Sequence, residues 1–156
     1  MELCSFLGFN APVFSIESTL ACISYKWDNC STRTEAAPGE KSLFWVGASK
    51  RDLRALPEVV QDHIGIALSV AQFGGRHPSV KPWKGEGPGV FEIVSDHRGD
   101  TFRAVFTVRF ALAIYVLHVF QKKSRQGKKT PQSDIGLISQ RLLVAREDYE
   151  VRYGKD

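Results

Sequence analysis

The chain has 156 residues, a length typical of one domain. With 43% hydrophobic, 24% charged and 11% aromatic residues, it can bury a core, which excludes wholesale disorder, a collagen-like repeat and a disulfide-dense miniprotein. Residues 1–40 contain two Lys or Arg and five Asp or Glu, a net charge of −3, so the total of +4 leaves +7 for residues 41–156. Such a surplus of cations attracts polyanions, which favours nucleic acid or the ribosome as a partner and disfavours an acidic metal site.

The three cysteines all lie in the first 40 residues, at Cys4, Cys22 and Cys30. Their odd number and their spacings match no zinc ligand set, so we expect free thiols in a reducing cytosol. The first cation is Lys26, whereas a signal peptide begins with positive charge. The apolar stretch 104–120 contains an arginine and a histidine in 17 residues, which is unsuited to lipid. The sequence therefore predicts a cytoplasmic protein without a membrane span.

Residues 1–40 form a predicted N-terminal extension. They show no sustained period of 2 or 3.6 residues and end in the polar run NCSTRTEAAPGE, which is typical of a linker. Three alternatives remain open: the extension is partly disordered, it adds a short strand, or it does not belong to the natural product.

Regular patterns begin at residue 41. The run LFWVGA from Leu43 predicts a strand, and Ser49 to Asp52 has the S-x-x-D form of a helix start. A second helix is expected from Pro57, in its first turn, until Gly74 and Gly75 end it. Its apolar positions recur at helical spacing: Val60, Ile64, Ala67, Leu68 and Ala71.

The second half of the chain reads as a sheet followed by a helix. KPWKGEGPG, residues 81–89, is expected to be a basic loop without regular structure. Strands follow at 90–95, 101–110 and 113–121, with a turn at 97–100. After the basic run QKKSRQGKK, Thr130 is the predicted N-cap and Pro131 the first residue of a helix with an apolar stripe at Ile135, Ile138, Leu142, Ala145 and Tyr149. Residues 41–156 are therefore predicted to form one small α+β domain with an antiparallel meander.

The long central strand has two chemically different faces. Alternation places Phe102, Ala104, Phe106, Val108 and Phe110 toward the core, and Arg103, Val105, Thr107 and Arg109 on a face expected to be free of helices. If residues 111 and 112 form a two-residue turn, Val105 pairs with His118, and Arg103, His118 and Phe120 share that outer face. A three-residue loop would turn His118 to the other side, and the residues leave both registers open.

The residue types on this face suit metal-free cleavage of RNA. That reaction needs a base for the 2′-hydroxyl proton, a cation for the charged phosphorus centre and an acid for the leaving 5′-oxygen. Arg103, His118 and the neighbouring lysines supply such groups, although a strand histidine is more often a structural hydrogen-bonder. Trp83 either stacks a base or packs over the sheet edge. GEGPG lacks the ending of a phosphate loop, and we expect no metal and no cofactor.

Several tracts carry a family resemblance in combination: LFWVGASKRDLRALPEVVQDHIGIAL, KPWKG, FEIVSDHRGDTFRAVFTVRFALAIYVLHVFQKKS and TPQSDIGLISQRL. From residue 41 to about residue 150, the chain resembles the phage-related, HigB-like branch of the RelE/ParE toxin superfamily. The resemblance implies a compact fold of helices packed on an antiparallel sheet. It implies the toxin of a type II toxin–antitoxin pair, a metal-independent endoribonuclease that cuts mRNA on the ribosome and leaves 2′,3′-cyclic phosphate and 5′-hydroxyl ends. The implied partners are the ribosome, mRNA and a cognate antitoxin, a small helix-turn-helix DNA-binding protein.

The resemblance also implies functional residues. The catalytic candidates are Arg103, His118, Lys84 and Lys122, and the RNA-binding candidates are Lys81, Trp83, Arg109, Phe120, Lys123, Arg125, Lys128 and Lys129. We expect His118 or a loop lysine as base, Arg103 as the stabilising cation, and Lys122 or Lys123 as a phosphate ligand and acid. The chain lacks the family's usual late catalytic tyrosine after a strand and offers Phe120 as a ring that could stack a base. The lack of this tyrosine leaves the exact acid and base open. The alternative is a binding module without nuclease activity, either a gyrase-inhibiting ParE-like toxin or a degenerate toxin.

Overall fold

A computed structural model of the chain describes residues 39–122 and 131–154. The backbone divides into two units, and every described residue belongs to the second, Ala36–Asp156. The predicted extension, apart from its last two residues, lies outside the described residues, as do the predicted cap Thr130 and the RNA-binding candidates Lys123, Arg125, Lys128 and Lys129. No helix in the described part of the chain is long and apolar enough to cross a membrane.

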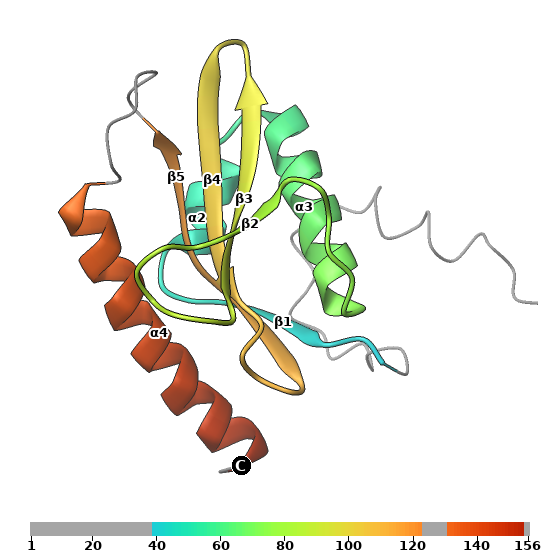
Figure 1. The fold of residues 1–156 in the computed structure, drawn as a ribbon, viewed down its shortest axis with the longest axis vertical. Helices are drawn as coiled ribbons and strands as arrows, with labels where there is room; N and C mark the ends of the chain where they lie inside the picture. Colours follow the sequence, from blue (N-terminus) through green and yellow to red (C-terminus); the bar gives the residue numbers. More distant parts are fainter. Residues whose placement is uncertain (1–38, 123–130, 155–156) are drawn as a thin grey trace, which may run out of the picture. The chain divides into compact units, whose positions relative to one another are not determined.

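The elements follow the predicted α+β order, with one strand added (Figure 1). They are β1 (Ser42–Trp45), α2 (Ser49–Arg54), α3 (Glu58–Gln72), β2 (Val80–Pro82), β3 (Val90–His97), β4 (Asp100–Thr107), β5 (Ala113–Lys122) and α4 (Gln132–Tyr153). The prediction that residues 81–89 lack regular structure is wrong at its start, because β2 pairs with β3. Pro82 is tolerated there because β2 is an edge strand, where one missing N–H need not break a ladder.

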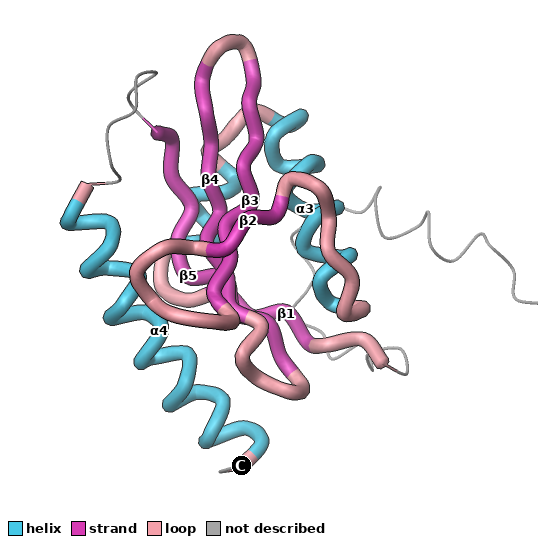
Figure 2. The backbone as a smooth tube through the Cα atoms, viewed as in Figure 1, coloured by secondary structure: helices cyan, strands magenta, loops and turns pink. Residues whose placement is uncertain are grey.

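The five strands form one sheet in the order β1-β5-β4-β3-β2 (Figure 2). The β2–β3, β3–β4 and β4–β5 pairs are antiparallel, as a meander requires, whereas β1 runs parallel to β5. A parallel pair needs a crossover between its strands, and here α2, α3 and three strands lie between β1 and β5 in the sequence.

Helices cover both faces of the sheet. One core cluster joins α2 and α3 to the sheet through residues such as Leu53, Ile64 and Phe106. A second cluster joins α4 to the opposite face, where Val105, Leu117 and Ile138 are fully buried. The prediction of a helix-free outer face is therefore wrong. That face is apolar at its centre, and burying this surface under the apolar stripe of α4 is favourable.

The predicted helical stripes are confirmed in detail. The five apolar positions proposed for α3 are its five buried residues, and four of the five proposed for α4 are buried, with Ile135 half-buried. The helix starts differ from prediction by one residue, since Pro57 and Pro131 are N-caps and precede the first helical residue. The prediction that Ser49 caps α2 as part of an S-x-x-D motif is wrong. Ala48 is the N-cap of α2, and the buried Ser49 hydroxyl donates to the Val116 carbonyl oxygen instead.

The two hairpins obtain their registers differently. At the β3–β4 turn, Arg98 and Gly99 both have positive φ, 50° and 87°, the arrangement of a two-residue type I′ turn that matches the twist of the strands. The β4–β5 connection, residues 108–112, is longer than the two-residue turn considered from the sequence. Val105 nevertheless pairs with His118, because a register shift leaves Leu117 unpaired and Phe106 faces Val116. Phe110 follows the end of β4 and packs in the α4 cluster, so its predicted place beside Phe106 is wrong.

Candidate active site

The candidate site lies on the sheet face that carries α4. Residues that pair across neighbouring strands point to the same face, and the strand registers place the polar side chains in rows. One row crosses β2, β3, β4 and β5 and consists of Lys81, Glu92, Val105 and His118. The next row consists of Val94, Arg103 and Phe120. Glu92, Arg103 and His118 therefore come from three consecutive strands and share one face, as predicted for Arg103, His118 and Phe120.

Arg103 is held by a carboxylate on the neighbouring strand. Its Nη1 donates to Glu92 Oε2 at 2.6 Å, and the two side chains are 19% and 13% exposed. Arg103 Nε is buried and has no hydrogen-bond partner among the described residues. A guanidinium has five N–H donors and the ion pair uses one of them, so Arg103 has further donors with which to bind a phosphate oxygen.

His118 lies between two charged side chains of α4. Arg141 Nη1 is 3.2 Å from its Nδ1, and Asp134 Oδ1 is 3.9 Å from its Nε2. The imidazole stacks on the Phe120 ring with centroids 5.1 Å apart. Burial, and then the positive charge of Arg141, lower the pKa of His118 below its ordinary value of 6.5, while Asp134 and Asp52 act in the opposite direction. This environment therefore favours the neutral form of the ring more than an ordinary histidine's does.

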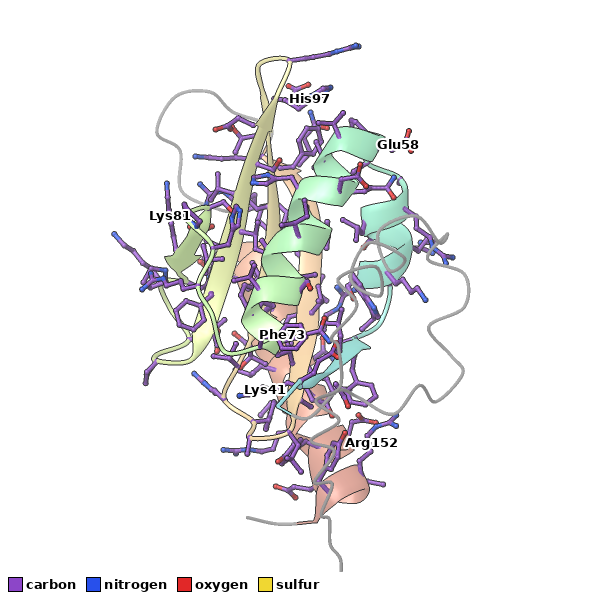
Figure 3. All side chains as sticks on the ribbon, turned by 90° about the vertical axis from the view of Figure 1, so that its right-hand side faces the viewer. Lys41, Glu58, Phe73, Lys81, His97 and Arg152 are labelled. Atoms are coloured by element: carbon purple, nitrogen blue, oxygen red, sulfur yellow. The ribbon has the colours of Figure 1, made fainter. Side chains whose placement is uncertain are left out.

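The candidate lysines lie at different distances from this group. Lys81 projects from the edge strand β2 (Figure 3), in the same row as Glu92. Lys84 is exposed in the β2–β3 loop. Lys122 is half-buried and lies four residues beyond His118 on β5, about 13 Å along the strand. The places of Lys84 and Lys122 suit contacts with phosphates around a bound RNA better than contact with the reacting atoms, whereas Lys81 lies next to Glu92.

Two further candidates, Trp83 and Arg109, make contacts that stabilise the fold. Trp83 is 6% exposed and belongs to the α4 cluster, so it packs over the sheet edge, the second of its two predicted alternatives. Arg109 Nε donates to the Pro88 carbonyl at 2.8 Å, and its Nη2 donates to the Glu86 carbonyl. Gly89 has φ 84°, and a Cβ there would lie 2.6 Å from Arg109 Cγ, so glycine is required for this approach. Arg109 therefore braces the β2–β3 loop.

Glu92 and Arg141 are among the residues of the site that were missed from the sequence. Glu92 had a usable signal: the two-residue turn at Arg98 and Gly99 sets the register of the hairpin, and counting back from it places Glu92 opposite Val105. Arg141 had none. It reaches His118 only because α4 packs across the sheet at one particular angle and height.

The combination of a carboxylate, a guanidinium and an imidazole has a definite chemical use. A carboxylate can take the proton of a ribose 2′-hydroxyl, a guanidinium can stabilise the charged phosphorus centre, and an imidazolium can protonate the leaving 5′-oxygen. The described residues contain no group of three or more His, Cys, Asp and Glu side chains placed to hold a metal ion.

Comparison with known proteins gives one family. The family model described as Phage derived protein Gp49-like (DUF891) matches residues 51–143, which include Glu92, Arg103, His118 and Arg141. A chain in the crystal structure of the toxin–antitoxin complex RelBE2 from Mycobacterium tuberculosis is similar at 21% identity and a TM-score of 0.35, over 58% of this chain and 100% of that chain. No curated protein matches the sequence.

Proposed function

Since the chain belongs to the Gp49-like family of phage-derived proteins, we propose that it is the toxin of a type II toxin–antitoxin pair, of the HigB-like kind. We propose that it acts as a metal-independent endoribonuclease on mRNA at the ribosome. The observation that carries this proposal is the placement of Glu92, Arg103 and His118 on one face of three consecutive strands. Base, cation and acid are the three groups that the reaction needs.

The proposed mechanism assigns one role to each group. Glu92 takes the proton of the 2′-hydroxyl, and the 2′-oxygen attacks phosphorus. Arg103 stabilises the negative charge that develops on the phosphoryl oxygens. His118 donates a proton to the 5′-oxygen as its bond to phosphorus breaks, which leaves a 2′,3′-cyclic phosphate and a 5′-hydroxyl. Glu92 and His118 lie on either side of Val105, two strand spacings or about 10 Å apart, so that base and acid can face opposite sides of one phosphodiester.

These roles change the expectations from the sequence. Glu92 replaces His118 or a loop lysine as the base, because it is the carboxylate that contacts Arg103. His118 becomes the acid in place of Lys122 or Lys123. Its lowered pKa favours the neutral form in the free protein, and a phosphodiester anion brought beside it favours the imidazolium that an acid requires.

The proposed partners are the ribosome, mRNA and a cognate antitoxin. The ribosome and mRNA would meet a surface on which Lys81 and Lys84 are exposed, and exposed lysines contribute sequence-independent affinity for phosphates. A cognate antitoxin with a helix-turn-helix DNA-binding fold would inhibit the protein in the cytoplasm.

The test is inducible expression of the full chain in a bacterium, with mapping of mRNA 5′ ends. We expect new cleavages inside translated frames, and we expect Arg103→Ala and His118→Ala to abolish them. Arg98→Ala is the matched control, since Arg98 lies exposed at the β3–β4 turn, and it should cleave like the wild type. Growth arrest with intact mRNA would instead indicate a gyrase-inhibiting relative, and continued growth with intact mRNA a degenerate binding module.

A further inference from the structure

Arg141 on α4 is anchored at three places. Its Nη1 donates to the Leu117 carbonyl oxygen at 2.7 Å and lies 3.2 Å from His118 Nδ1. The guanidinium also lies over Gly47, where an added Cβ would be 3.2 Å from both Nε and Nη2. The side chain is half-buried, so its position is set by the β5 bulge, the β1–α2 connection and its own helix.

The β-bulge explains why these groups meet. Leu117 is the residue that the register shift leaves without a partner on β4, and a bulge frees backbone groups from the ladder. Arg141 donates to that freed carbonyl oxygen. Nη1 carries two hydrogens, so one can point to the Leu117 oxygen while the other points to the neighbouring ring nitrogen of His118.

An arginine side chain can only donate hydrogen bonds, and it stays protonated at any pH that a folded protein tolerates. A ring nitrogen that receives an N–H from arginine must offer a lone pair. In a neutral imidazole, the other nitrogen then carries the proton. We propose that Arg141 is a positioning residue that holds His118, in the free protein, as the neutral tautomer with its proton on Nε2.

This tautomer deepens the proposed function and rests on it for its catalytic meaning. While the bond to Arg141 is intact, Nδ1 is occupied and Nε2 is already protonated, so His118 has no lone pair with which to act as a base. An imidazolium would carry a second proton on Nδ1, facing the Arg141 N–H, so the ring must move away from Arg141 before it can act as an acid. In the free protein, Arg141 therefore holds His118 in a form that acts neither as a base nor as an acid. Binding of the RNA phosphate moves the ring away from Arg141.

The charges around the ring agree with this arrangement. Arg141 and Asp134 act on it from α4 and Asp52 acts from α2. Arg141 lowers the pKa of His118, and the two carboxylates raise it. Removing Arg141 leaves only the two carboxylates from this set of charges, so the pKa of His118 should rise.

The tautomer can be measured without any nuclease assay. In the ¹⁵N-labelled full chain, correlation of each ring nitrogen with the ring carbon protons assigns the protonated nitrogen of His118 above its pKa. We expect the Nε2–H form in the wild type. In Arg141→Met we expect a mixture of both tautomers and a His118 pKa that is higher than in the wild type. Arg146→Met is the control, because Arg146 is an exposed arginine on the same helix, and it should leave the tautomer and the pKa unchanged.

The wild-type spectrum can overturn the proposal by itself, even if Arg141→Met does not fold, whereas the role of Arg141 is established by the difference between the two proteins. An Nδ1–H tautomer in the wild type would overturn it, and so would a folded Arg141→Met protein with the wild-type tautomer and pKa. In the cleavage assay, the alkaline limb of the pH–rate profile should move to higher pH in Arg141→Met. A protein with the Nε2–H tautomer that cuts no RNA would refute the proposed function and leave the role of Arg141 standing.

Discussion

Replacing Glu92 by glutamine separates the chemical role of this side chain from its structural one. Glutamine keeps the length of the side chain and an oxygen that can accept the hydrogen bond from Arg103 Nη1, now 2.6 Å from Glu92 Oε2. It cannot take up a proton at neutral pH. The variant should therefore keep the sheet intact and lose the base.

The expected size of each effect follows from the contact. A positioned general base contributes about 10²- to 10⁴-fold to a rate, which at 1.36 kcal/mol for each factor of ten is about 3–5 kcal/mol in the activation barrier. The change in the free energy of unfolding should be smaller, about 1–2 kcal/mol. A charge-assisted bond becomes a neutral one, and both side chains retain some exposure to water, 13% for Glu92 and 19% for Arg103.

The assay compares single-turnover cleavage of ribosome-bound mRNA with urea unfolding of the same protein. Glu86→Gln is the matched control, because Glu86 is a half-buried glutamate whose carboxylate accepts a hydrogen bond from the Ser139 hydroxyl, outside the Glu92 and His118 row. It should cleave at close to the wild-type rate. A folded Glu92→Gln protein that cuts mRNA as fast as the wild type would refute the assignment of Glu92 as the base.

Two further predictions concern stability. Tyr115→Phe removes the hydroxyl that donates to Asp148 Oδ2 at 2.8 Å. Because Asp148 keeps its 2.6 Å bond from Arg152, we expect the free energy of unfolding in urea to fall by about 1–2 kcal/mol. Tyr153→Phe, at a residue that is 39% exposed, should change it little. An equal loss in both variants would contradict the reasoning. The pKa of His118 is lowered from 6.5 in the folded state, so the unfolded chain binds this proton first and stability should fall as the pH drops below about 6.5. His118→Gln should reduce that slope in unfolding titrations between pH 5 and 8, and an unchanged slope would show that the pKa is not lowered.

The sequence by itself determined most of the local structure. The spacing of Val60, Ile64 and Ala71 located α3 and its buried side, because one face of a helix returns every 3.6 residues. Alternation along residues 101–107 separated Phe102 and Ala104 from Arg103 and Val105, because side chains alternate along a strand. These are properties of neighbouring residues, and a periodic pattern records them directly.

The tertiary structure decided which groups meet. The sequence predicted a sheet face without helices, yet α4 covers that face. The sequence could not predict this, because the apolar stripe of α4 could have packed against either side of the sheet. The bulge at Leu117 determines that His118 pairs with Val105. The sequence did not predict this bulge or the length of the loop that precedes β5. Glu92 could have been placed from the turn at Gly99, since a two-residue hairpin transmits its register along both strands. The position of Arg141 could not be predicted from the sequence. Its contact with His118 depends on how α4 packs on β5, and no local sequence pattern indicates that packing.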